Sequence, residues 1–357
     1  MDFAELSNEQ RRQLIDVKQA FEVWRSAQRQ FASSYKGTVR WKKSKGHEYL
    51  YRTIYRGEQE ISRSLGPRSP ETEKIKDDYS NARARLRQRL NKLQSRLKGM
   101  APVNRALRLN RVPAIETSIL SALDREGLLG KQLFVVGTNA LFAYELMAGV
   151  LFPSDLLATG DMDLLWDHRP RLSLVITDVE AHGVLGVLRG VDSSFQPAGR
   201  GSFRAENNQG YLVDLIRAEE RDLRVNAPQK IGRSEEDLYA VGIHGLQWLV
   251  NAPKVEETVI GSTGMPLLMS CIDPRAFALH KLWVSRRDDR APTQRPRDSA
   301  QAVAIAALVL TYLQRPFEGS ELSALPKELR NLAPELKKMA KNWIKENSHD
   351  DETQRSL

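Results

Sequence analysis

Two aspartates, Asp161 and Asp163, stand one residue apart in an otherwise apolar segment, and this pattern limits what the chain can form there. Successive residues of a β-strand point to opposite faces, so both carboxylates share one face while Met162, Leu164 and Trp166 occupy the other. Two ionised carboxylates side by side repel each other, which is costly in a sheet core unless a cation lies between them. The segment from Asp161 to Trp166 therefore predicts a strand that presents a divalent-metal site. The alternative is a solvated or salt-bridged turn.

A third carboxylate, Asp214, lies inside the apolar run 211–216, which is typical of a strand. A buried aspartate needs a partner, either a cation site or an arginine. If its strand neighbours that of the first two acids, three carboxylates converge and can hold two Mg²⁺ or Mn²⁺ ions. Two such ions can bind the attacking and leaving oxygens of an in-line phosphoryl displacement. An Asp214 carboxyl that lies away from the first two, or that is turned toward an arginine, would contradict this three-carboxylate site and the enzymatic function built on it.

A glycine follows the apolar run Leu133 to Val136, which predicts a buried strand that ends at Gly137. Glycine lets the backbone approach a phosphate closely, and the free N–H groups of a following helix attract anions. The Thr138 hydroxyl adds a hydrogen-bond donor. We therefore predict that Gly137, Thr138 and Asn139 bind a nucleotide, with an ordinary tight turn as the alternative.

The order of these motifs resembles the signature of the DNA polymerase β-type nucleotidyltransferase superfamily. The usual superfamily loop is Gly-Gly or Gly-Ser, so Thr138 is a departure that keeps the hydroxyl. A closer resemblance is to a bacterial family of nucleotidyltransferase-fold proteins, and it covers most of residues 38–315. The segments that carry it include 46–52, 64–69, 136–145, 161–167, 210–215 and 273–283. The resemblance implies a polymerase β-like fold with a metal triad of Asp161, Asp163 and Asp214, and it leaves the acceptor open.

The hydrophobic pattern from Val112 onwards predicts an α/β (α+β) unit in the order βαββαββ, which suits a mixed sheet with flanking helices. Expected strands are 133–136, 161–166, 172–177, 202–205 and 210–216. Expected helices are 114–127, 139–148, 179–189, 274–287, 298–314 and 326–346. We therefore divide this part into a catalytic domain at 111–272, a C-terminal helical subdomain at 273–346 and a disordered tail at 347–357.

The region 1–110 has a different pattern, with a long helix at 6–34, a β-hairpin at 38–56 and a second long helix from Ser69 to about Lys98. Basic and aromatic residues alternate in the hairpin, and arginines cover the second helix. Cations neutralise phosphates and aromatic rings stack on unpaired bases, so this region is a candidate nucleic-acid-binding arm. The formal net charge of +9 favours an anionic partner such as RNA. The alternative is a hairpin and helix packed on the catalytic core, with basic residues that only aid solubility.

Basic residues outside this region are candidates for binding the triphosphate. The superfamily resemblance implies a cation on the helix after the catalytic sheet, where Lys281 matches and Arg286, Arg287 and Arg297 follow. Arg204 lies just before the Asp214 strand, and we predict that it lines the nucleotide pocket. Ser202, Asn207 and Asn208 are weaker candidates. We expect structural roles for His280, a salt bridge for Asp167 and a loop-orienting role for Glu145.

The sequence lacks features that several classes of site and location require. The single cysteine, Cys271, excludes an intramolecular disulfide and a zinc site built on cysteines. No apolar stretch approaches the ~20 residues of a membrane helix, and the first residues lack the pattern of a secretory signal. We expect a cytoplasmic protein without membrane contact.

These observations lead to three hypotheses. The first is an enzyme that uses Mg²⁺ or Mn²⁺ to transfer a nucleoside monophosphate from an NTP such as ATP to RNA, with tRNA as the leading acceptor. The second is a toxin-like or regulatory transferase that modifies a protein or tRNA and is controlled by a protein partner. The third is a catalytically inactive module that binds nucleotides or nucleic acid.

Overall fold

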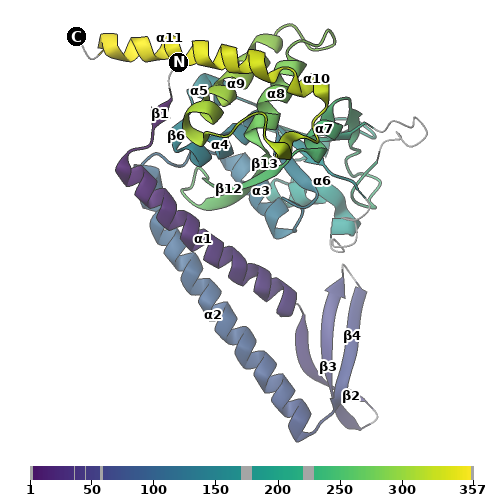
Figure 1. Ribbon diagram of the computed structural model, residues 1–357. Helices are drawn as coiled ribbons and strands as arrows, with labels where there is room; N and C mark the ends of the chain where they lie inside the picture. Colours follow the sequence, from purple (N-terminus) through teal and green to yellow (C-terminus); the bar gives the residue numbers. More distant parts are fainter. Residues whose placement is uncertain are drawn as a thin grey trace. The chain divides into compact units, whose positions relative to one another are not determined.

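The chain forms two compact units. The computed structural model describes residues 3–35, 37–44, 46–56, 59–169, 179–219 and 229–354 (Figure 1). The larger unit consists of residues 1–11, 111–259 and 267–357, and the smaller unit of residues 12–110 and 260–266. The C-terminal helices belong to the same compact unit as the sheet.

The larger unit is built on a mixed eight-stranded sheet with the order β12-β13-β5-β7-β10-β9-β8, and β11 also pairs with β10. The strands are β5 (Leu133–Val136), β7 (Asp161–Trp166), β8 (Gln196–Pro197), β9 (Arg204–Glu206), β10 (Leu212–Ala218), β11 (Val241–Ile243), β12 (Lys254–Ile260) and β13 (Pro266–Ile272). β7 runs parallel to β10 and antiparallel to β5. β9 and β10 form the antiparallel pair expected from the sequence. The predicted strand 172–177 lies outside the described residues.

Helices flank this sheet, as the pattern predicted (Figure 1). They are α3 (Ala114–Arg125), α4 (Leu141–Ala148), α5 (Ser154–Leu157), α6 (Val179–Val191), α7 (Leu246–Asn251), α8 (Pro274–Val284), α9 (Arg295–Leu308), α10 (Lys327–Arg330) and α11 (Ala333–Gln354). A short 3₁₀ turn, Thr138–Ala140, joins β5 to α4, and β1 (Ala4–Glu5) pairs with β6 (Val150–Leu151). Helix α11 continues to Gln354, into the tail that we expected to be disordered.

The first turn of α8 is fixed by buried charges. Asp273 caps the helix by accepting a hydrogen bond from the backbone N–H of Arg275. The Arg275 guanidinium is 2% exposed and pairs with Asp273, donates to the carbonyl of Pro316 and pairs with Glu321. A fully buried guanidinium needs this many partners. The helix that follows the last strand is therefore anchored at its start.

The centre of the sheet is apolar and closed to solvent. Cys271 of β13 pairs with Val135 of β5, and both are fully buried. Burial raises the pKa of the Cys271 thiol well above its ordinary value. Next to it, the Tyr144 hydroxyl donates a hydrogen bond to the carbonyl of Ile272 at 2.7 Å, which ties α4 to β13.

The smaller unit contains the long helix α2 (Pro70–Ala106), most of the long helix α1 (Asn8–Ser34) and a three-stranded antiparallel sheet. Its strands are β2 (Thr38–Ser44), β3 (His47–Arg56) and β4 (Gln59–Pro67). The helices run antiparallel: Gln13 bonds Asn104 at one end, and Phe31 contacts Arg83 near the other (Figure 1). The sequence predicted only the β2–β3 hairpin. Strand β4 is serine-rich and lacks clear alternation.

No helix among the residues that the structure describes has both the length and the apolar character required to span a membrane.

Candidate active site

Four neighbouring strands place a row of residues on one face of the sheet. Asp163 of β7 lies opposite Val136 of β5, and it also pairs in register with Asp214 of β10. Asp214 in turn lies opposite Arg204 of β9. Paired residues of adjacent strands point to the same face. Asp161 shares this face because it is two residues from Asp163, so the three acids lie on one face of two adjacent strands.

The surroundings of Asp163 make its ionisation unfavourable. Burial raises its pKa to about 7, and the negative charges of Asp161 and Asp214 add to the effect. Lys281 and Arg290 partly oppose this shift. A buried acid next to like charges is the arrangement that a cation would relieve.

Asp161 is held by its neighbours on both sides. The Thr159 hydroxyl donates a hydrogen bond to its carboxylate, and the Asn139 amide donates to its backbone carbonyl at 2.8 Å. Asn139 therefore contacts the backbone of the acidic strand, a role different from the nucleotide contact that we predicted for it. Its amide fixes the turn after Gly137 to the start of β7.

The backbone angle and the close neighbours at position 137 require a glycine there. Its φ angle is +69°, a value that glycine adopts readily and other residues rarely do. A Cβ atom at this position would overlap Oδ2 of Asp163. The predicted glycine turn and the predicted acid therefore touch directly, and any side chain at position 137 would displace the carboxylate.

Asp214 is paired with an arginine, which corrects the three-carboxylate site. Arg204 donates from Nε and Nη2 to the two carboxylate oxygens of Asp214, each at 2.7 Å. Asp214 is 8% exposed and Arg204 is 37% exposed. Within the described ranges, no three acidic, histidine or cysteine side chains converge as metal ligands. In this conformation Arg204 is therefore a partner of Asp214, and the preformed triad that the sequence predicted is absent from these ranges.

Helix α9 reaches the glycine turn through two polar side chains. The Thr138 hydroxyl accepts a hydrogen bond from Gln301 at 3.1 Å and one from Arg297 at 3.4 Å. Arg297 also donates to the carbonyl of Ala158. Arg297 thus brings a positive charge to the predicted phosphate turn. From the sequence alone, Arg297 was only one of several arginines that follow Lys281.

Lys281 on α8 is held in place by Asp298 on α9. The Lys281 ammonium donates to Oδ1 of Asp298 at 2.6 Å, and Arg290 donates to Oδ2 at 2.7 Å. Although burial opposes it, these two cations lower the pKa of Asp298. Both cations also act on the pKa of Asp163. The predicted residue Lys281 therefore lies near the acids, together with Arg290, which the sequence analysis missed.

Other predicted residues lie in different surroundings. Arg286 forms an exposed salt bridge with Glu335 of α11. Asn207 stabilises its own turn by accepting the backbone N–H groups of Gln209 and Tyr211. The expectations of structural roles are confirmed for two acids: Asp167 pairs with Arg169, and Glu145 pairs with Arg111 and accepts the N–H of Phe152.

A cavity of about 280 Å³ adjoins the acidic row. Gly137 and Asp163 form part of its wall, and α8 supplies Phe277, His280 and Lys281. The wall also contains Val136, Ile216, Ile243, His244, Leu246, Leu249, Trp283, Val284, Arg287, Asp289 and Arg290.

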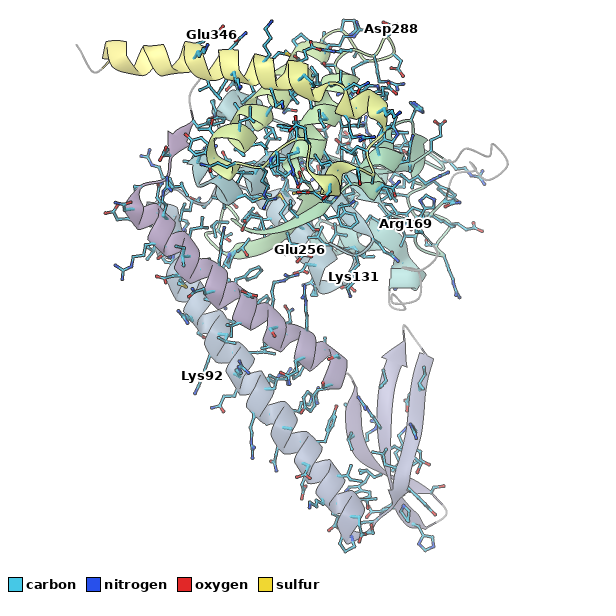
Figure 2. The ribbon with its side chains drawn as sticks, in the orientation of Figure 1. Lys92, Lys131, Arg169, Glu256, Asp288 and Glu346 are labelled. Carbon is cyan, nitrogen blue, oxygen red and sulfur yellow. The ribbon has the colours of Figure 1, made fainter. Side chains whose placement is uncertain are left out.

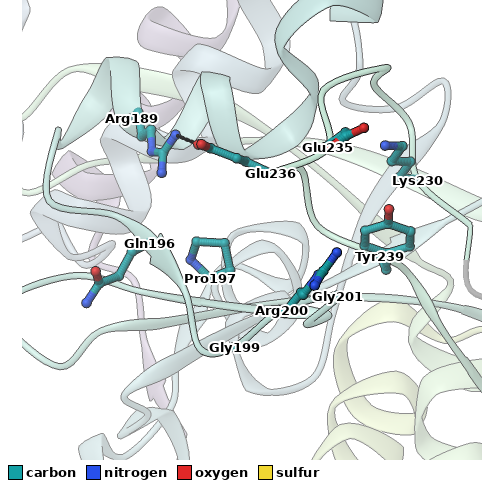
Figure 3. Close-up of a pocket in the computed structure, with 10 residues that line it drawn as sticks. All are labelled: Arg189, Gln196, Pro197, Gly199, Arg200, Gly201, Lys230, Glu235, Glu236 and Tyr239. Carbon is teal, nitrogen blue, oxygen red and sulfur yellow. Dashed lines mark hydrogen bonds and ion pairs between the residues drawn. The ribbon is translucent and has the colours of Figure 1, made fainter.

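A larger and more open cavity of about 930 Å³ lies elsewhere in the same unit (Figure 3). It is lined by Arg189, Gln196, Pro197, Gly199, Arg200, Gly201, Lys230, Glu235, Glu236 and Tyr239. Arg189 and Glu236 form an ion pair at its edge. None of the predicted site residues lines it, so the smaller cavity is the one connected with the acidic row.

A family model described as Nucleotidyltransferase matches residues 115–326, which is more than half of the chain. The chain belongs to this nucleotidyltransferase family. Membership assigns it to nucleotidyl transfer and implies an NTP substrate. No curated protein matches the sequence. Among solved structures, an antigenic nucleotidyltransferase-like protein from Paracoccidioides brasiliensis is 16% identical, with 64% of this chain and 94% of that chain covered. The TM-score is 0.31, too low for this match to carry an argument.

One buried acid of this nucleotidyltransferase was not predicted. Glu116 of α3 is 1% exposed, and its Oε2 and the Tyr211 hydroxyl have no hydrogen-bond partner of good geometry among the described residues. Burial raises the pKa of Glu116 to about 8, and the charge of Asp161 contributes. The sequence held a signal: Glu116 occupies the apolar stripe of α3 that continues through Ile119, Leu120 and Leu123.

Proposed function

We propose that this nucleotidyltransferase transfers a nucleoside monophosphate from an NTP to RNA with the help of a divalent metal. The observation that carries the proposal is the direct contact between the glycine turn and the acidic row, next to a cavity. In the reaction, an acceptor oxygen forms a bond to the α-phosphorus while the bond to the β-phosphate oxygen breaks. Pyrophosphate leaves.

The residues present fit a metal in part. Asp161 and Asp163 offer oxygen ligands, which Mg²⁺ prefers, and the pKa of Asp163 is raised by its burial and then by the charges of Asp161 and Asp214. Asp214 fits only if Arg204 first leaves its carboxylate. A bound metal would supply charge neutralisation at the phosphates and at the acceptor oxygen.

The chain's own side chains have separate tasks in this proposal. The backbone of Gly137 and the hydroxyl of Thr138 bind the β- and γ-phosphates. Arg297 and Lys281 neutralise them, because α8 and α9 hold both cations near the acids. Fixed charges of this kind stabilise a phosphoryl-transfer transition state without further reorganisation.

The acceptor is proposed from the distribution of charge. Residues 12–110 contain 24 of the chain's 54 Lys and Arg but only 9 of its 45 Asp and Glu, so this segment has a formal charge of +15. The whole chain has +9, so the remainder is acidic overall. Lys92 is one of the exposed cations that stand out from α2 (Figure 2). A polyanion such as tRNA is the partner that this segment suits best.

The test follows the transfer of an α-labelled nucleotide to an acceptor. The full chain is incubated with each α-labelled NTP, Mg²⁺ and total cellular RNA and protein, and the products are separated on a gel. We expect label on RNA, and we expect Asp161→Ala/Asp163→Ala to abolish it. Glu346→Ala, which removes an exposed acid of α11, serves as the matched control and should keep full activity. Label on protein alone would replace the RNA proposal, and inactivity with every NTP and acceptor would refute the enzymatic one.

Calorimetry separates the enzyme from an inactive binding module. An enzyme of the proposed kind binds NTP more tightly with Mg²⁺ than without it. Binding that is independent of the metal would favour the module.

A further inference from the structure

Three buried polar atoms lie between helix α3 and strand β7 without hydrogen-bond partners. They are Oε2 of Glu116, the hydroxyl oxygen of Tyr211 and Oδ1 of Asn139, and none has a partner of good geometry among the described residues. Glu116 and Asn139 are each 1% exposed. An unpaired buried polar atom is costly and rare, so three of them among neighbouring side chains call for an explanation.

Tyr211 stands between the other two side chains. Burial raises the pKa of its hydroxyl, Glu116 raises that pKa further, and the side chain of Asn139 opposes the shift. The hydroxyl is therefore within reach of both residues. The backbone beside it is also fixed, because the N–H of Leu212 donates to the carbonyl of Gly160 at 3.1 Å. This hydrogen bond ties the chain next to Tyr211 to the start of β7.

The amide of Asn139 connects this group to a predicted metal ligand. Its Nδ2 atom donates to the backbone carbonyl of Asp161 at 2.8 Å. Asn139 also follows Thr138 in the predicted phosphate turn, so its amide links the turn to the acidic strand. The amide holds this contact only while it keeps its orientation. The atom that could fix the orientation from the other side is Oδ1, which is the one without a partner.

The donors and acceptors of the group match in one order. Burial raises the pKa of Glu116 to about 8, so its carboxyl carries a proton at neutral pH and can donate one hydrogen bond. A tyrosine hydroxyl can accept one hydrogen bond and donate another. Two hydrogen bonds then pair all three atoms: the carboxyl of Glu116 donates to Tyr211, and the hydroxyl of Tyr211 donates to Oδ1 of Asn139.

We propose that Glu116, Tyr211 and Asn139 form a relay of hydrogen bonds that holds Asp161 in position to bind the divalent metal. The inference rests on the proposed function, because it concerns how a ligand of that metal is oriented. Groups that hydrogen-bond a metal ligand from behind fix its geometry and tune its affinity. Glu116 acts through the two other side chains, so it is a positioning residue and takes no part in the chemical step.

The test measures Mn²⁺ binding to the full chain from the electron paramagnetic resonance signal of the free ion. Glu116→Leu keeps a side chain of similar size and removes the donor at the start of the relay. It should weaken Mn²⁺ binding about 10-fold to 100-fold, the usual effect of losing a group that supports a metal ligand. Glu116→Gln still offers a donor through its amide, and it should restore binding close to the wild-type value.

A second variant covers the case in which Glu116→Leu fails to fold. Tyr211→Phe removes a single oxygen atom from the middle of the relay, and it should weaken Mn²⁺ binding by a similar factor. Ile119→Val is the matched control, because it trims another fully buried side chain of α3 that lies outside the relay. It should leave Mn²⁺ binding unchanged, even where its melting temperature without metal falls as far as that of the relay variants.

The outcomes distinguish the two proposals. Unchanged Mn²⁺ binding in Glu116→Leu or in Tyr211→Phe would overturn the inference and leave the proposed function intact. An equal loss in Ile119→Val, or a failure of Glu116→Gln to restore binding, would do the same. If Asp161→Ala/Asp163→Ala binds Mn²⁺ no differently from wild type, the acids do not hold the metal and both proposals are wrong.

Discussion

The guanidinium of Arg204 occupies the position from which a cation would engage Asp214. It makes two hydrogen bonds to the carboxylate, and a bidentate pair of this kind is among the stronger contacts of a guanidinium. A metal ion and Arg204 therefore compete for the same oxygens. The competition has a measurable consequence in the protein without nucleotide.

Arg204→Gln should lower the free energy of unfolding by about 1–3 kcal/mol, less than for a fully buried pair because Arg204 is 37% exposed. Added Mg²⁺ should then raise the melting temperature more than it does in wild type. The matched control is Arg169→Gln, which removes the arginine partner of another buried acid, Asp167. It should be destabilised with no enhanced response to Mg²⁺. Equal responses in both variants would contradict the competition.

The contact between Gly137 and Asp163 gives a second prediction. Gly137→Ala should reduce transfer activity at least about 100-fold, because the new methyl group overlaps the carboxylate and misplaces it. Gly210→Ala is the control: its φ of +77° is also positive, yet nothing lies within 4 Å of the added Cβ. Both variants should lose about 1–3 kcal/mol of stability from the positive φ. Equal activities would show that only backbone strain matters.

The sequence predicted the positions and partners of these residues with different success. The shared face of Asp161 and Asp163 follows from the two-residue period of a strand, and it needed no knowledge of the fold. The position of Asp214 beside them depends on strand order, which only the resemblance implied. The pairing with Arg204 follows from the cross-strand register of the β9–β10 hairpin, which propensity does not specify.

At the scale of elements, helix α2 presents a stripe of cations. Arg85, Arg89 and Lys92 are exposed and spaced by four and three residues, so they share one face. Arg85→Ala/Arg89→Ala/Lys92→Ala should weaken binding of a labelled tRNA. It should also reduce the slope of log affinity against log salt by about two to three units. Filter binding over a range of salt concentrations measures both.

The control for this prediction removes the same charge from another helix. Lys338, Lys341 and Lys345 are exposed along α11, and their replacement by alanine changes the net charge by the same amount. An equal loss of RNA affinity in the two variants would show that overall charge, and no particular surface, attracts the RNA.

Elements whose ends carry clear sequence signals, such as helix-capping residues, could be predicted from the sequence. Helix α2 was recognised by Ser69 and Pro70 at its start, and both residues act as expected in the capping turn. Its end was placed about eight residues too early, since neither Gly99 nor Pro102 stops it. Strands β12 and β13 were not assigned, although β13 lies beside the glycine strand. Long-range pairing creates those strands, and local pattern carries little information about it.

At the scale of the whole molecule, buried acids make folding depend on pH. The pKa of Glu116 is raised to about 8, so the folded chain binds this proton more tightly than the unfolded chain does. The resulting stability is complete below the ordinary glutamate pKa of about 4.3 and is lost as pH rises through about 8. Asp163 and Glu145, both with a pKa raised to about 7, act in the same direction.

Glu116→Gln isolates one of these contributions. Glutamine does not ionise, so the variant should gain stability relative to wild type as pH rises from about 5 to 8, by up to about 1.4 kcal/mol per pH unit. Urea unfolding of the metal-free protein at several pH values measures this difference. Glu346→Gln, at an exposed position, should follow the wild-type curve. Parallel curves for Glu116→Gln and wild type would show that the buried carboxyl does not bind its proton unusually tightly.

The lone thiol of the chain has a use that follows from its place in the sheet. Cys271 lies on β13 directly beside β5, the strand that leads into Gly137. A labelling reagent reaches this buried sulfur only while the packing around it opens. The rate of labelling under native conditions therefore measures how often the region beside the strand that leads into the phosphate turn opens locally, and a bound nucleotide that stabilises this region would slow the labelling.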